Sequence, residues 1–211
     1  MGHQHIVTSP SGPVRHAIRI GSMSGRSLGF SLVEVLVSIV VLSFGLLGMV
    51  GMQAAALQSN REARVQSTAV SFARELAELM RGNKDVGILT TSNPYVGSFS
   101  SPMAATAASY CLNVATGTTA CIDQTDIANA QMTEWLARVD AQLPGARVDV
   151  CFDSAPFDSR GLPQWACTAT NGVIVIKIGW TRGSTNRSKT GAAALEHATI
   201  PSVVFPVIAG V

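Results

Sequence analysis

Apolar residues follow one another almost without interruption near the start of the chain. No charged residue occurs between Val35 and Asn60, and the stretch from Val35 to Met52 contains only apolar residues, glycine and serine. As a helix rising about 1.5 Å per residue, some twenty residues of this kind would cross a hydrocarbon layer about 30 Å thick. The pattern therefore predicts either a membrane-spanning helix or a secretory signal.

Beyond Asn60 the pattern changes to that of an amphipathic helix, with apolar residues at alternating spacings of four and three. Charged residues occupy the opposite face, and Gly82-Asn83 is a common ending for a helix. We expect one continuous helix from Phe30 to Arg81, whose second half packs against a globular domain. The apolar stripe of that second half comprises Val65, Ala69, Phe72, Leu76 and Leu79.

The segment that follows this helix predicts a loop and then a second helix. Residues 82–124 are rich in Ser, Thr, Ala and Gly, which favours a long connecting loop. Residues 125–143 carry an apolar stripe with helical spacing, and Pro144-Gly145 would end that helix.

The last part of the chain predicts a small antiparallel sheet. Apolar residues alternate from Val148 to Phe152 and again from Ile174 to Trp180, and a looser strand is expected over Thr199–Phe205. Pro201 suits only an edge strand or the start of a strand. The predicted fold is therefore α+β, with the long N-terminal helix packed on a small antiparallel sheet.

Length and charge limit the classes of function. A chain of 211 residues has room for one membrane helix and one globular domain. Hydrophobic residues make up 47% and charged residues only 13%, which indicates that part of the surface meets lipid or other subunits. The net charge of +2 is small and scattered, so nucleic acid is not an expected partner.

The cysteines predict disulfide bonds. Cys111, Cys121, Cys151 and Cys167 form an even set with no C-x-x-C pair, which favours disulfides in an oxidising compartment over zinc or redox chemistry. Of the three possible pairings we favour Cys111 with Cys121 and Cys151 with Cys167, because each closes a short loop; four unpaired thiols are the alternative. No metal or cofactor is expected, and the cysteines place the C-terminal part outside the cytoplasm.

An ordinary signal peptide is the main alternative for the apolar stretch. Ala54-Ala55-Ala56 resembles a cleavage site, and cutting there would release a secreted periplasmic enzyme or binding domain beginning at Leu57. Two features argue against it: Glu34 stands at the start of the apolar run, and the helical pattern continues past the alanines. No metalloprotease, serine-hydrolase or phosphate-loop motif is present, so no catalytic residue is expected and the chain is predicted not to be an enzyme.

The residues from Arg26 to Leu36, Arg-Ser-Leu-Gly-Phe-Ser-Leu-Val-Glu-Val-Leu, resemble the class III signal of type IV prepilins. The resemblance implies that a prepilin peptidase cuts between Gly29 and Phe30 and that Phe30 is then N-methylated. It also implies that Glu34 helps to dock the subunit into a growing filament. The leader would cover residues 1–29, and translation starting at Met23 would retain the part that the peptidase needs.

A weaker resemblance concerns the C-terminal part. The order Trp135, Leu143-Pro144-Gly145, then Trp180-Thr181 resembles the type IV pilus modification protein (PilV) family of minor pilins. It implies a structural subunit that primes or caps a type IV pilus. Its expected partners are other minor and major pilins, the prepilin peptidase, an inner-membrane assembly platform, a tip adhesin and membrane lipid.

The expected organisation follows from these features. A leader over residues 1–29 precedes a transmembrane and amphipathic helix over residues 30–81 and a periplasmic globular domain over residues 82–211. The protein would cross the bacterial inner membrane once and then enter the pilus. A type II secretion pseudopilin shares this leader and helix, and it stays open as an alternative.

Overall fold

A computed structural model describes residues 29–113, 119–169, 172–184, 186 and 188–208. The chain divides into two compact units, Met1–Gly51 and Met52–Val211, which we describe separately and call the stem and the outer domain. The part of the expected leader that precedes Gly29 lies outside the described residues.

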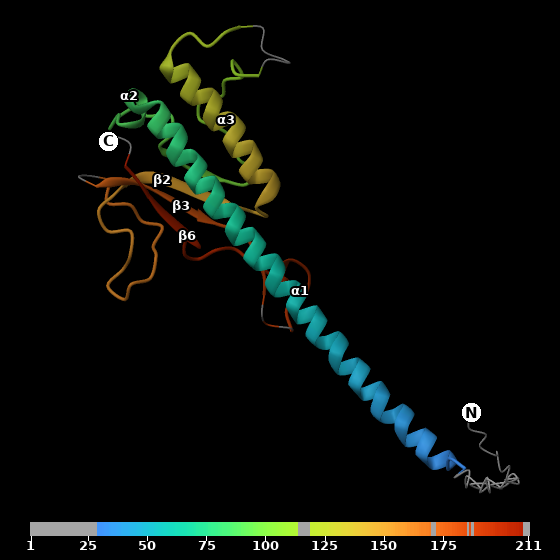
Figure 1. Cartoon of the computed structure of the whole chain (residues 1–211). Helices are drawn as coiled ribbons and strands as arrows, with labels where there is room; N and C mark the ends of the chain where they lie inside the picture. The colour runs from blue at the N-terminus through green and yellow to red at the C-terminus, as the bar shows by residue number, and fades with distance from the viewer. Residues whose placement is uncertain (1–28, 114–118, 170–171, 185, 187, 209–211) are drawn as a thin grey trace, which may run out of the picture. The chain divides into compact units, whose positions relative to one another are not determined.

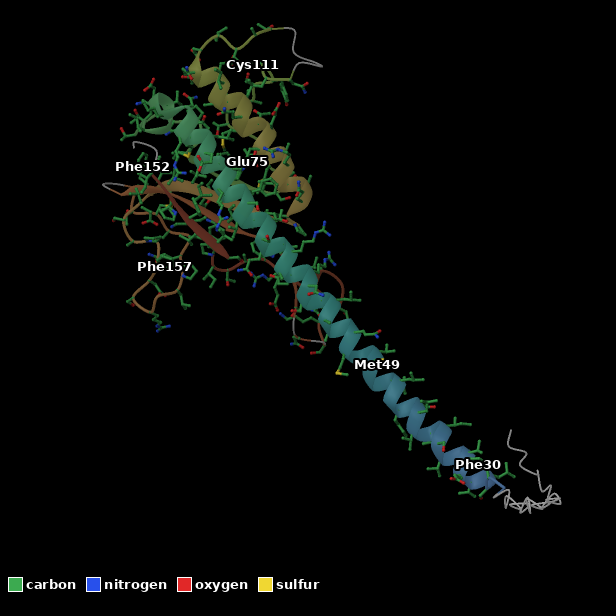
Figure 2. All side chains as sticks on the ribbon, in the orientation of Figure 1. Phe30, Met49, Glu75, Cys111, Phe152 and Phe157 are labelled. Carbon is green, nitrogen blue, oxygen red and sulfur yellow. A yellow bond between two sulfur atoms is a disulfide. The ribbon has the colours of Figure 1, made fainter. Side chains whose placement is uncertain are left out.

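The first helix, α1, spans Leu32–Gly82, close to the expected bounds. In the stem every side chain of this helix is exposed, and Figure 2 shows the labelled Phe30 and Met49 side chains projecting away from the chain. In the outer domain the helix buries one face, which comprises Ala69, Phe72, Ala73, Leu76, Ala77 and Met80. This face is wider than the stripe expected from the sequence, because alanines add to it.

The main sheet of the outer domain contains strands β1 (Gly97–Ser100), β2 (Arg147–Asp153), β3 (Val173–Gly179) and β6 (Val203–Val207). They lie in the order β1-β2-β3-β6, and each neighbouring pair is antiparallel. The α+β arrangement of a long helix and a small antiparallel sheet is thus confirmed, and it is consistent with a pilin-like fold.

Helix α3 (Gln124–Gln142) lies beside α1 in the outer domain (Figure 1). Its N-cap is Asp123, whose side chain accepts a hydrogen bond from the Asp126 amide. The indole Nε1 of Trp135 donates to the carbonyl of Phe72 at 3.1 Å, and their rings meet edge to face. Trp135, fully buried, therefore joins the two helices over the sheet.

The structure corrects three of the sequence expectations for this domain. The region expected to be a long loop contains a short helix, α2 (Lys84–Gly87), and the edge strand β1. The last strand begins at Val203, later than expected. A small second sheet, formed by β4 (Arg182–Gly183) and β5 (Leu195–Glu196), was not expected at all. All of these elements are too short to give a periodic pattern.

Candidate assembly site at the start of the N-terminal helix

The first turn of α1 is held by a serine cap. The Ser31 hydroxyl accepts a hydrogen bond from the Val33 amide at 3.3 Å, and the Ser31 carbonyl accepts one from the Glu34 amide at 3.0 Å. Glu34 is the third residue of the helix, where a carboxylate interacts favourably with the positive end of the helix dipole. The helix therefore starts at Leu32, with only Phe30 and Ser31 between it and the expected cleavage point.

The Ser31 cap was missed in the sequence, although the signal was present. A serine followed three residues later by a glutamate, just before an apolar run, is a typical start of a helix. Glu34 thus has a local role at the helix terminus in addition to the docking role that the prepilin resemblance implies.

Phe30 and Glu34 lie one turn apart at the start of the stem. They line a shallow, open groove of about 240 Å³ together with apolar residues and one serine of the next two turns. The Phe30 side chain is 81% exposed. The groove is lined by stem residues alone, so it is available to another chain as far as the described residues go.

The Glu34 carboxylate forms no hydrogen bond or ion pair with any other described residue. A carboxylate inside a hydrocarbon layer costs about 3 kcal/mol or more, unless a cation or a donor pairs with it. The chemistry of the site is therefore that of an acceptor for a positive group, presented beside an exposed aromatic ring.

The rest of the stem is suited to an apolar environment. Ser38 and Ser43 donate their hydroxyl hydrogens to backbone carbonyls one turn earlier, each at 2.7 Å, so neither exposes an unpaired donor. The apolar half of the helix is not buried, and by length and composition the helix is able to cross a membrane. These features, which a signal sequence can share, are consistent with membrane anchoring.

None of the described residues packs against the glycines of the stem helix. At Gly45, Gly48 and Gly51 an added Cβ would meet nothing within 4 Å. Glycine weakens an isolated helix by up to about 1 kcal/mol relative to alanine, so packing against another molecule is a more economical reason for these residues.

Comparison with known proteins identifies one motif in this chain. A family model of the prokaryotic N-terminal methylation motif matches residues 25–50. No curated protein and no solved structure matches the chain. The motif supports a type IV prepilin-like protein, either pilin-like or a pseudopilin, and it indicates a structural pilin-like subunit.

The cysteines are joined as Cys111–Cys121 and Cys151–Cys167, the two pairs that the sequence favoured. Asp126 lies close to the first pair and Asp153 to the second. Because the sulfur atoms in each cluster are bonded to one another, they offer no thiolate to a metal ion.

The residues that carry the weaker family resemblance lie close together in the outer domain. Trp135, Leu143 and Trp180 are all buried in one core. The Thr181 amide donates to the Pro144 carbonyl at 2.8 Å, and the Thr181 hydroxyl donates to the carbonyl of Gly145.

Gly145 has a structural requirement of its own. Its φ of 51° is in the left-handed region, and an added Cβ would stand 2.4 Å from the Thr181 hydroxyl oxygen. The turn after α3 therefore docks on the end of β3.

A buried ion pair on the sheet was not anticipated. Lys177 Nζ lies 2.6 Å from the Asp153 carboxylate, and both side chains are fully buried. The ammonium group also donates to the carbonyl of Ala166, at 2.7 Å, and so holds the loop between β2 and β3 against the sheet. The signal in the sequence was a single lysine within the apolar alternation of β3.

Burial and hydrogen bonding act in opposite directions on Asp153. Burial raises the pKa of this carboxyl group, but hydrogen bonds from Lys177 and from the Ala155 and Thr168 amides outweigh it. The pKa of Asp153 therefore lies below its ordinary value, and this carboxyl group is ionised at neutral pH.

Proposed function

We propose that this protein is a minor pilin of the type IV pilus, a structural subunit that primes assembly of the filament or caps it. The observation that carries the proposal is the methylation motif at residues 25–50, set on a helix whose apolar half is exposed while its second half is built into a folded domain. The resemblance to the PilV family supports the minor role, because the residues that carry it lie together in the outer domain.

The proposed maturation has two steps. The prepilin peptidase cuts between Gly29 and Phe30, removing the leader, and Phe30 then receives a methyl group on its new α-amine. The serine cap supports this assignment, because it begins the helix directly after Phe30 and leaves the bond at Gly29 outside the helix. A peptide bond outside the helix is more accessible to a peptidase than a bond within it.

The proposed assembly step uses Glu34 as the acceptor for a neighbouring subunit's α-amine. Moving the stem from lipid into a bundle of similar stems leaves apolar contacts largely unchanged, since lipid and side chains are equally apolar. The pairing of a carboxylate with an amine in that environment then decides the register of the incoming subunit. The other proposed partners are minor and major pilins, the inner-membrane assembly platform and a tip adhesin.

The proposed location follows from the same features. The stem crosses the bacterial inner membrane once, and the disulfide-bonded outer domain lies in the periplasm until the subunit enters the pilus.

The first test is the mass of the mature protein, purified from cells that contain a prepilin peptidase. We expect a chain that begins at Phe30 and carries one additional methyl group. Gly29→Leu should keep the leader, and Gly45→Leu, the same change within the stem, should be processed normally. A mature chain that begins at Leu57 would show that an ordinary signal peptidase releases the domain, and the proposal would then fail.

The second test measures incorporation into pili sheared from the cell surface. Glu34→Val should reach the membrane in normal amount but should be reduced at least tenfold in the pili. Ser43→Val, which changes an exposed stem residue outside the groove, is the matched control and should be incorporated normally. Equal incorporation of both variants would contradict the docking role of Glu34.

The same cells distinguish a pilus subunit from a secretion pseudopilin. Deletion of the gene should impair surface piliation and twitching while leaving protein secretion unchanged. A secretion defect in cells with normal pili would assign the chain to the type II secretion system instead.

A further inference from the structure

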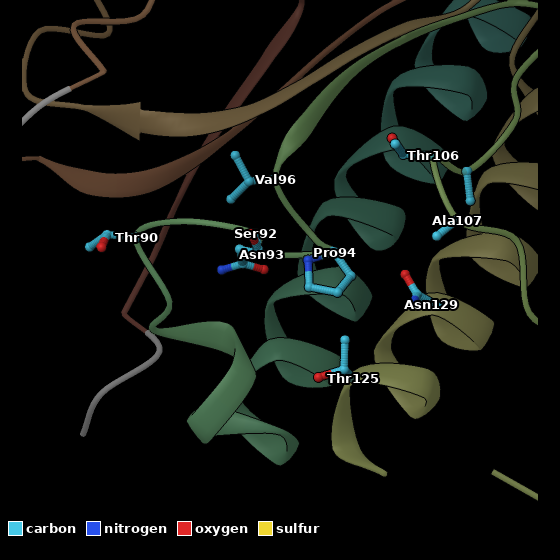
Figure 3. Close-up of a pocket in the computed structure, with 10 residues that line it drawn as sticks. Thr90, Ser92, Asn93, Pro94, Val96, Thr106, Ala107, Thr125 and Asn129 are labelled. Atoms are coloured by element: carbon cyan, nitrogen blue, oxygen red, sulfur yellow. The ribbon is translucent and has the colours of Figure 1, made fainter. Parts of the chain in front are cut away.

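A pocket of about 450 Å³ lies in the outer domain between the loop that follows α2 and the first half of α3 (Figure 3). Three separate segments line it: residues 90–96, residues 105–107, and Thr125 with Asn129 of α3. This volume is within the range of sites for small molecules. All ten residues that line the pocket belong to the outer domain. The proposed role of the stem in assembly therefore does not involve this pocket.

The walls of this pocket are held in place by hydrogen bonds. The buried Asn93 side chain donates to the carbonyls of Gly87 and Leu89 and accepts from the Tyr95 amide, which fixes the loop on one side. The Tyr95 hydroxyl then bonds to Gln131 of α3. The cavity is therefore preformed on this side and is not a gap between mobile segments.

The opposite wall is attached to the same helix. The Ser109 amide donates to the Thr133 hydroxyl at 3.1 Å, and that hydroxyl donates to the Asn129 carbonyl at 2.7 Å. Both walls are thus fastened to one turn of α3, at Gln131 and Thr133, so the width of the pocket is set by the helix. A preformed site loses little entropy when a ligand binds.

Several polar groups face the pocket without a partner. Among the described residues, the side chains of Ser92, Thr106, Thr125 and Asn129 form no hydrogen bond or ion pair with one another or with the rest of the domain. Each hydroxyl can both donate and accept, and the amide offers one acceptor and two donors. Ser92 also has a φ of 54°, a backbone conformation that few serines adopt.

The lining selects against charged ligands. None of its ten residues ionises. Asp123 and Asp126 stand beside Thr125 in the chain, and their carboxylates are already used by the amides of Asp126 and Ile122 at the start of α3. These carboxylates repel an anion, while their engagement as caps leaves them poorly placed to hold a cation.

Apolar surface completes the lining, with contributions from Pro94, Val96, Ala105 and Ala107. Alternating hydroxyl and C–H groups are the surface of a sugar ring, and this mixture of free hydroxyl, amide and small apolar groups is complementary to it. We propose that the pocket binds a neutral hexose unit. None of the ten described residues that line the pocket has an aromatic ring to stack on the sugar, so we expect an affinity in the millimolar range.

The test uses the full chain in detergent micelles with ¹³C-labelled alanine and valine methyl groups. The probes are the methyl glycosides of glucose, galactose and mannose, with glucuronic acid and sialic acid as anionic comparisons. We expect saturable shifts of the Val96, Ala105 and Ala107 methyl signals with at least one neutral glycoside and none with the acids. If neither the neutral glycosides nor the free hexoses shift these signals, or if the acids shift them equally, the proposal is wrong.

Two variants locate the binding. Asn129→Leu removes a free amide at nearly constant volume and should weaken binding about tenfold, whereas Asn60→Leu, the same change at an exposed position of α1, should leave it unchanged. Ala107→Phe fills the pocket from an exposed position and should abolish the shifts, which keeps the test valid if Asn129→Leu unfolds. Unchanged binding in Ala107→Phe would place the sugar elsewhere and overturn the assignment.

The hexose could come from the end of a glycan or from a free sugar. The methyl glycosides distinguish these two sources, because their anomeric position is blocked as it is in a glycan. Binding of the methyl glycosides indicates the terminal unit of a glycan, whereas binding of the free hexoses alone indicates a free sugar. Both results support the class of ligand. Because the readout comes from the outer domain alone, it is independent of whether the stem assembles into a pilus.

Discussion

The stem and the outer domain contain similar apolar residues in opposite surroundings. Leu47 of the stem is 69% exposed, whereas Leu76, on the same helix within the outer domain, is fully buried. Exposure of a row of large apolar side chains to water costs about 25 cal/mol for each Å². The outer domain thus removes the apolar side chains of its core from water by itself, and the stem needs lipid or other chains to do so.

The same contrast holds for carboxylates. In the outer domain Asp153 has a lysine partner and two backbone donors, so its charge is satisfied inside the chain. In the stem Glu34 has no side-chain partner among the described residues. An unpaired carboxylate in an apolar helix is unfavourable in an isolated chain. It therefore indicates where another molecule is required.

The largest effect is expected from the buried pair of the outer domain. Lys177→Met should lower the free energy of unfolding by about 3–5 kcal/mol, because it leaves the buried Asp153 without its partner. The measurement is urea unfolding of the full chain in micelles, followed by the fluorescence of its three tryptophans, all of which lie in the outer domain.

Two controls sharpen that result. The double change Lys177→Met with Asp153→Leu should recover most of the loss, since no charge is then left buried. In the wild type the contribution of the pair is present above the ordinary Asp pKa and is lost as pH falls through the lowered pKa. In Lys177→Met the unpaired Asp153 binds a proton more readily, so the deficit should shrink in acid; a deficit independent of pH would contradict this account.

The second prediction compares one substitution in both regions. Leu136→Ala should destabilise the outer domain by about 2–5 kcal/mol, because Leu136 is fully buried and the change leaves a cavity. Leu47→Ala should change the unfolding of that domain by less than about 0.5 kcal/mol. The same urea titration measures both, and a large effect of Leu47→Ala would show that the stem supports the domain after all.

The smallest effect is expected at the surface of the outer domain. Glu75 forms an ion pair with Arg138 of α3, but both side chains are well exposed to solvent. Glu75→Gln should therefore lower the free energy of unfolding by less than about 1 kcal/mol, and added salt should reduce the difference. A loss comparable with that of Leu136→Ala would mean that this pair, and not the core, holds α3 on α1.

The sequence predicted the elements whose signal is local. The apolar run and the following stripe predicted α1 to within two residues at its start and one at its end, and alternation predicted β2 and β3. The prepilin-like motif could also be read directly, because a peptidase recognises a short linear segment. The cap at Ser31 was equally local, and the sequence contained enough to find it.

Tertiary structure decided the remaining features. Strand β1 has only four residues and is stabilised by pairing with β2. It is too short for an alternation of apolar and polar residues to predict it. Lys177 lies opposite Asp149 of β2, and its ammonium group reaches the carboxylate of Asp153 further along that strand, so the buried pair exists only once β2 and β3 have paired. The pocket likewise unites three segments that are separated in the chain.

One physical reason separates the features that the sequence predicted from those that tertiary structure decided. A helix that faces lipid or other subunits is specified by its own residues, because it has no neighbours within the chain to override their preferences. A short strand, a buried pair or a pocket depends on contacts between distant residues, and their free energy is gained only when the whole domain has folded.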